Sequence, residues 1–156
     1  MRWAEAVEGA SEKYGPPDCR EEQAVSNQSM LKLKETEERQ KKLIEKLKKL
    51  IQENNDLVGE MQQTLGTRIA SVVVSVPLDR LGFIGDILGR YFDNMIGKEL
   101  IDKAKTYGER LAVVRKNIYY TRDQLRLAMA ITTQAKETLD RAQTALERCL
   151  SSHTGK

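Results

Sequence analysis

A heptad pattern of apolar positions fills the C-terminal part of the chain. Between residues 98 and 150, apolar or small residues recur at alternating steps of four and three without a break, at Leu100, Ala104, Tyr107, Leu111, Val114, Ile118, Thr121, Leu125, Ala128, Thr132, Ala135, Leu139, Ala142, Leu146 and Cys149. Such a repeat is typical of a helix that packs lengthwise against another helix. The pattern therefore predicts a coiled-coil helix over residues 98–150.

A second heptad runs through the N-terminal half. Its positions are Leu33, Thr36, Gln40, Leu43, Leu47, Leu50, Asn54, Leu57 and Met61, and they are mostly polar before Leu43. Asp18, which follows two prolines, and Glu21 have the spacing of a capping box, and Gly66 marks an end. We expect a helix over residues 18–65. Asn54 falls on the seam, where a buried amide would fix the register; the alternative is exposure at the edge of the seam.

The two predicted helices are similar in length, and the second carries small residues at one seam position, with Ala128, Ala135 and Ala142 alternating with leucines. Small residues allow two helix backbones to approach closely. We therefore expect a mainly α fold, a long antiparallel coiled-coil hairpin. Residues 1–17 and 151–156 are expected to be tails of a single domain over residues 18–150.

The connecting segment, residues 66–97, has a different composition. Residues 69–76 are rich in β-branched side chains, and residues 81–88 follow after Pro77 and a short turn, which predicts a small central β-hairpin. Tyr91 and Phe92 fit either a third short strand or the approach to the second helix. A lone hairpin cannot bury its apolar face, so we expect a platform that assembles with other chains, formed by Val72, Val74, Val76, Leu81, Phe83, Ile84 and Ile87.

Composition and charge narrow the class of protein. Charged residues make up 31% of the chain and aromatic residues only 5%, which suits solvent-exposed helices better than a compact enzyme core. The net charge is +3, and the lysines from Lys41 to Lys49 are interleaved with Glu37, Glu38, Glu45 and Glu53, so nucleic acid is not an expected partner. No apolar run could span a membrane and no signal peptide is evident. The cytoplasm or the nucleus is the expected compartment.

Catalytic chemistry is missing from the sequence. The glycines at 82, 85 and 89 lack the context of a phosphate-binding loop, and His153, the single histidine, lies in a polar tail. We expect no enzyme activity, no cofactor and no metal. Antiparallel helices would bring Cys19 and Cys149 to the same end. Two unrelated small residues are the favoured interpretation there, and a redox clip is the alternative.

The sequence over residues 76–88, VPLDRLGFIGDIL, followed by GRYF, resembles the hairpin strands of the prefoldin family, in its α-class and unconventional subunits. The order helix, strand pair, helix is also similar. One Val- and Ile-rich strand of the family is missing, because Leu88 runs directly into Gly89.

The resemblance implies a hexamer built on a shared β-barrel, with helical hairpins that hold unfolded client proteins and pass them to a chaperonin. Clients would contact the tips at Ala24, Val25, Met30, Leu31 and Leu150. The expected function is thus a non-catalytic chaperone or co-chaperone subunit whose partners are other prefoldin-like or coiled-coil subunits. The alternative is a structural coiled-coil adaptor in a tethering or cytoskeletal complex.

Overall fold

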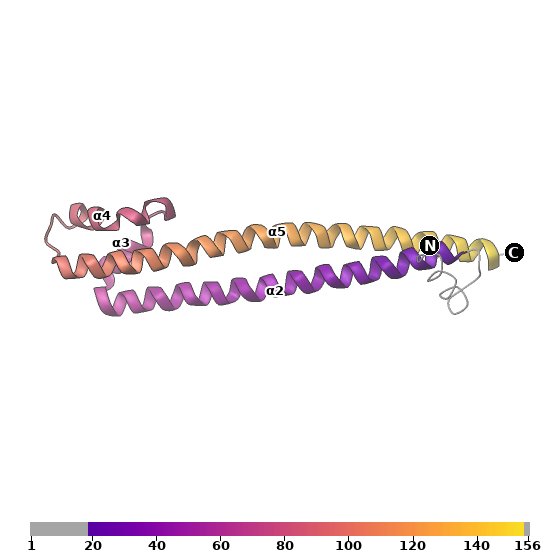
Figure 1. Ribbon diagram of the computed structural model, residues 1–156, viewed down its shortest axis with the longest axis horizontal. Helices are drawn as coiled ribbons and strands as arrows, with labels where there is room; N and C mark the ends of the chain where they lie inside the picture. Colours follow the sequence, from indigo (N-terminus) through magenta and orange to yellow (C-terminus); the bar gives the residue numbers. More distant parts are fainter. Residues whose placement is uncertain (1–18, 155–156) are drawn as a thin grey trace, which may run out of the picture. The chain divides into compact units, whose positions relative to one another are not determined.

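A computed structural model describes residues 19–154 of the chain, and every element in this part is helical (Figure 1). The elements in chain order are α2 (Arg20–Leu65), α3 (Thr67–Ser75), the 3₁₀ helix η2 (Leu78–Phe83), α4 (Ile84–Tyr91) and α5 (Lys98–Thr154). The mainly α class is therefore confirmed. Within the described residues, no helix combines the length and the apolar character that crossing a membrane requires.

The two long helices follow the heptad patterns closely. Helix α5 begins at Lys98, as expected, and continues past the expected end at residue 150 to Thr154. Every seam position from Leu100 to Cys149 is buried or partly buried, as is every seam position of α2 from Leu33 to Met61. The expected N-terminal tail, residues 1–17, lies outside the described residues.

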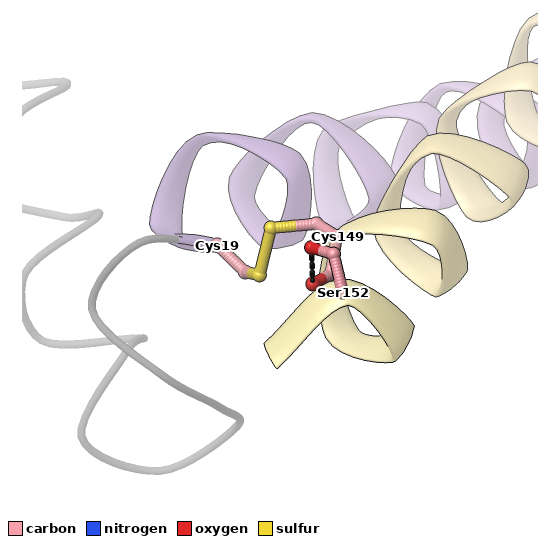
Figure 2. Close-up of a disulfide and its surroundings, with 3 residues drawn as sticks. All are labelled: Cys19, Cys149 and Ser152. Atoms are coloured by element: carbon pink, nitrogen blue, oxygen red, sulfur yellow. Dashed lines mark hydrogen bonds between the residues drawn. A yellow bond between two sulfur atoms is a disulfide. The ribbon is translucent and has the colours of Figure 1, made fainter. Parts of the chain in front are cut away.

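The chain divides into two compact units. Among the described residues, unit 1 comprises 19–42 and 125–154, and unit 2 comprises 43–124, so α2 and α5 contribute one stretch each to both. In unit 1 a disulfide joins Cys19, just before α2, to Cys149 in the last turns of α5 (Figure 2). In unit 2 the Tyr107 hydroxyl donates a hydrogen bond to the Thr64 hydroxyl, 3.1 Å away. In each unit the two stretches run antiparallel (Figure 1).

Unit 2 has a conventional hydrophobic core. Leu57, Met61 and Leu65 of α2 pack with residues from every other element, namely Ala70, Val73, Val76, Leu81, Ile84, Leu88, Ala104, Tyr107, Leu111, Val114 and Ile118. In Figure 1, α3 and α4 lie beside the first turns of α5. The connecting segment thus covers the helix pair with apolar side chains of its own.

The seam of unit 1 is built from small side chains. Its buried residues are Cys19, Ser26, Ser29 and Thr36 on the side of α2, and Ala128, Thr132, Ala135, Leu139 and Ala142 on α5. The threonine hydroxyls bond to their own helix, Thr36 to the Leu33 carbonyl and Thr132 to the Ala128 carbonyl, each at 2.9 Å. These bonds satisfy the hydroxyls, so the seam can bury them at little cost.

The predicted β-hairpin is wrong: residues 69–76 lie mainly in α3, and residues 81–88 lie in η2 and α4. The physical reason is the spacing of the apolar side chains. Ala70 and Val73, and then Leu81, Ile84 and Leu88, recur at steps of three and four and bury one face of each short helix in the core. Burial of that face outweighs the β-propensity of the valine run.

Specific contacts hold the short helices in place. Gly66 separates α2 from α3 with a φ of 88°, a left-handed conformation that glycine adopts without strain. At the other end of α3, the Arg115 guanidinium donates to the carbonyl oxygens of Val74 (2.7 Å) and Val76 (3.1 Å). These carbonyls have no partner within the helix, so Arg115 caps α3 from α5.

Helix α4 ends in a Schellman motif, which excludes a third strand, one of the two alternatives at Tyr91 and Phe92. The Asn94 amide donates to the Gly89 carbonyl (2.8 Å) and the Asp93 amide to the Arg90 carbonyl (3.3 Å). Asp93 and Asn94 both have positive φ, 53° and 59°. The turn that follows leads into α5.

Asn54 lies partly buried in unit 2. Its Oδ1 is shielded from solvent and has no hydrogen-bond partner, so this atom is not exposed at the edge of the seam. The residue lines a small cavity with Ile51, Arg115, Ile118, Tyr119 and Arg122. A role for Asn54 in fixing the register stays a prediction.

Candidate functional site

A groove in unit 2 lies between α3 and the segment formed by η2 and α4. It has a volume of about 630 Å³ and is lined by Thr67, Arg68, Ser71, Val72, Ser75, Val76, Pro77, Arg80, Ile87, Tyr91 and Phe92. Helix α3 supplies one wall, and η2 and α4 supply the other. We call it the α3–α4 groove.

The groove combines an apolar lining with positive charge. Val72, Val76, Pro77, Ile87 and Phe92 provide the apolar surface. Arg68 and Arg80 are exposed at the groove, and neither forms a salt bridge with any described residue. The lining contains no aspartate or glutamate. An occupant with apolar side chains and carboxylates would therefore complement this groove.

Two aromatic side chains of the groove are arranged around Arg68. Its guanidinium lies over the Phe92 ring, 5.6 Å from the centroid, which is within cation–π range. Tyr91 packs edge-on against Phe92 with the ring centroids 4.9 Å apart. Tyr91 nevertheless remains 67% exposed. A large aromatic side chain at the mouth of a groove is a typical anchor for a partner protein.

The lining carries hydroxyls and two guanidinium groups as its polar groups. It holds no cysteine, histidine or carboxylate, and hydroxyls are its only candidate nucleophiles. The Ser75 hydroxyl donates to the Val72 carbonyl at 2.8 Å, within its own helix. Without a base beside it, a serine hydroxyl is a poor nucleophile at neutral pH.

The residues predicted to form an assembly platform separate into three groups. Val72, Val76 and Ile87 line the groove, together with residues not predicted. Leu81 and Ile84 are each 1% exposed, and Val74 packs partly buried against the same core. Phe83 is 64% exposed. The argument that another chain must cover all seven side chains is wrong for Leu81 and Ile84, because the chain covers them itself.

The predicted client contacts lie in unit 1 and do not form one surface. Val25 lines a groove of about 370 Å³ with Ile131, Ala135 and other residues of the helix pair. Leu31, which is 62% exposed, lines a different groove with charged residues of α2 alone. Met30 is also exposed, whereas Ala24 and Leu150 are partly buried.

Several residues of these surfaces were missed in the sequence. Arg68, Arg80 and Tyr91 meet in the groove only because α3 and α4 pack as helices, which no local pattern reveals. In unit 2, Val113 and Tyr120 are exposed and lie seven residues apart on α5, and in unit 1 Leu127 and Ile131 are exposed four apart. This spacing places each pair on one helix face, so the sequence alone could have indicated both pairs.

Comparison of the chain with protein-family models, curated proteins and solved structures finds no match in any of the three.

Proposed function

We propose that the chain is a non-catalytic helical adaptor that assembles with a partner protein through the α3–α4 groove. The occupant we infer is an amphipathic partner helix that places apolar side chains on the groove floor and carboxylates beside the arginines. This proposal keeps the assembly role expected for residues 66–97, with helices in place of a β-platform.

One observation carries the proposal: an apolar groove of about 630 Å³ whose only charged lining residues, Arg68 and Arg80, have no salt-bridge partner among the described residues. Helix-in-groove recognition uses apolar anchors on one face of the incoming helix. Arginines at the edge add specificity and faster association more than affinity. The groove provides both features.

Site-specific photo-crosslinking in cells tests the proposal. A photoreactive phenylalanine analogue replaces Tyr91 in the groove, and the same analogue at Tyr119, exposed on α5, serves as the comparison. We expect Tyr91 to crosslink to a partner segment that is helical, apolar on one face and acidic at its flanks. The R68E/R80E variant should lose that crosslink, because its groove would repel carboxylates.

The matched control is K98E/K116E, which makes the same change of charge on exposed lysines outside the groove. This variant should keep the crosslink. The adaptor proposal fails if the Tyr91 crosslinks are absent, or if they persist unchanged in R68E/R80E. Binding of the identified segment to purified protein should weaken as salt increases.

The exposed apolar side chains of unit 1 support a second candidate, the prefoldin-like role of holding non-native clients and passing them to a chaperonin. Val25, Met30 and Leu31 are 41%, 43% and 62% exposed. Adaptable apolar residues such as methionine suit weak contacts with many sequences.

Suppression of aggregation tests this second function. We expect the purified chain to slow the aggregation of a heat-denatured model enzyme, and V25S/M30S/L31S to lose most of that effect. A variant at Ile51, exposed in unit 2, provides the control. Equal protection by all three proteins, or none by the wild type, would rule out these residues as a client surface.

A further inference from the structure

The disulfide end of unit 1 holds a third metal-ligating side chain. Cys19 and Cys149 have their Cα atoms 5.9 Å apart, and Glu22 lies almost one helical turn beyond Cys19. One carboxylate oxygen of Glu22 and the two sulfur atoms all lie within 4.8 Å of one another. Figure 2 shows the two cysteines meeting between the start of α2 and the last turns of α5.

One carboxylate oxygen of Glu22 has no hydrogen-bond partner beside the disulfide. Its Oε1 is shielded from solvent and accepts no hydrogen bond. A shielded carboxylate oxygen without a donor is costly, because it loses its water without a replacement. A cation bound between the carboxylate and two thiolates would supply the missing partner. The disulfide, which is neutral, cannot do so.

We propose that the reduced protein binds one Zn²⁺ ion through the Cys19 and Cys149 thiolates and the Glu22 carboxylate, with water as the fourth ligand. Two sulfurs and one oxygen form a donor set that zinc accepts in tetrahedral geometry. The site therefore has two states, a disulfide and a zinc thiolate. Both states connect the start of α2 to the end of α5.

The zinc form and the disulfide form differ little in the positions of their two sulfur atoms. Zinc–sulfur bonds of about 2.3 Å at a tetrahedral angle place two sulfurs ~3.8 Å apart. Rotation of the cysteine side chains can provide this separation while the backbones stay in place.

Oxidation of the zinc form releases the metal. A small-molecule disulfide accepts two electrons from the pair of protein thiolates: the sulfur–sulfur bond between Cys19 and Cys149 forms, and that of the oxidant breaks. The products are the protein disulfide, two small-molecule thiolates and free Zn²⁺, so atoms and charge balance. A small-molecule thiol runs the exchange in reverse. In a reducing compartment the zinc form would maintain the cross-link.

Cobalt titration of the full chain tests the proposal. The protein is reduced, freed of reductant without air and titrated with Co²⁺, whose thiolate complexes show charge-transfer bands in the near ultraviolet. We expect saturation at one equivalent, displacement by one equivalent of Zn²⁺, and no bands for the oxidised protein. The absence of thiolate-to-cobalt bands in the reduced wild type would overturn the proposal.

Variants of Glu22 and of its neighbour Glu21 test the contribution of the carboxylate to metal binding separately from that of the thiols. E22Q should still form the disulfide, which shows that the fold is intact, but bind Co²⁺ at least about tenfold more weakly, or ~1.4 kcal/mol. E21Q changes the neighbouring, exposed carboxylate and should bind like the wild type. If E22Q binds as tightly as E21Q, Glu22 is not a ligand and the three-residue site is wrong.

Discussion

Unit 1 and unit 2 both pair a stretch of α2 with a stretch of α5, but different types of side chain are buried between the two stretches. Unit 2 buries leucine, isoleucine, valine and methionine side chains from five elements. Unit 1 buries mainly serine, threonine, alanine and cysteine from two helices and is closed by a disulfide. The same heptad spacing therefore specifies two kinds of contact, one stabilised by apolar burial and one by close approach and a covalent bond.

The difference has an energetic consequence. Apolar burial contributes about 25 cal/mol per Å², so small side chains give unit 1 less stabilisation for each turn of helix. Cys19 and Cys149 are 130 residues apart in sequence, and joining them restricts the unfolded chain. We infer that the disulfide offsets the weaker seam.

Matched leucine truncations should show the contrast most strongly. Leu111 in unit 2 is 0% exposed, and Leu139 in unit 1 is 9% exposed. We expect L111A to lower the free energy of unfolding by about 4 kcal/mol and L139A by about 2, within the range for buried leucines. Chemical denaturation, with hydrogen exchange read separately over each unit, measures both. Equal losses would mean that the two interiors are packed equally well.

Removal of the disulfide should act most strongly on unit 1. C19S/C149S is expected to lose about 2–4 kcal/mol, with the largest rise in amide exchange over residues 20–42 and 125–152 and a smaller rise over 43–124, because the cross-link also restricts the unfolded chain between the two cysteines. A chelator present throughout excludes any contribution from bound metal. Faster exchange spread evenly over both units would show that the disulfide does not act locally.

The comparison of units also explains what the sequence could predict. The heptads of α5 and α2 were readable because large and small seam residues follow one unbroken spacing. The seam of α2 in fact extends back through Ser29 and Ser26 to Cys19, since all three are buried. The extension is not evident in the sequence, because Ser26 and Ser29 are polar and a search for apolar seam positions passes over them. Continuing the spacing to Cys19 would have favoured the disulfide over two unrelated cysteines.

The connecting segment was misread for the opposite reason. Three consecutive valines, Val72 to Val74, have high β-propensity, and that local signal outweighed the helical spacing of Leu81, Ile84 and Leu88. Packing in the core of unit 2 determines that the segment is helical, and this core combines residues that are far apart in sequence. The α3–α4 groove was unpredictable for the same reason, because Arg68 and Tyr91 meet only after α3 and α4 have packed.

Glycine substitutions should measure how closely the elements of unit 2 approach. A Cβ on Gly108 would lie 3.2 Å from Ile84 Cγ2 and 3.6 Å from the Leu81 carbonyl oxygen. We expect G108A to lose about 1 kcal/mol, because overpacking exceeds the gain in helix propensity. G59A is the matched control: its Cβ meets nothing within 4 Å, so it should gain about 0.5–1 kcal/mol. A gain in both variants would show that α4 can move away from α5.

Two buried threonines, one in each unit, differ in whether their hydroxyls have a hydrogen-bond partner. Thr121 in unit 2 is 0% exposed and its Oγ1 has no hydrogen-bond partner, whereas Thr132 in unit 1 donates to the Ala128 carbonyl at 2.9 Å. Valine has nearly the same shape but lacks the hydroxyl. We therefore expect T121V to raise the free energy of unfolding by about 1 kcal/mol, because it removes an unsatisfied polar group. T132V should change it by about 0.5 kcal/mol or less, because the satisfied hydroxyl is lost together with its bond to the same helix.

Thermal and chemical denaturation of T121V and T132V measure the difference between their free energies of unfolding. If T121V is destabilising, the hydroxyl of Thr121 has a partner in solution, and the interior of unit 2 is less strictly apolar than its core residues indicate.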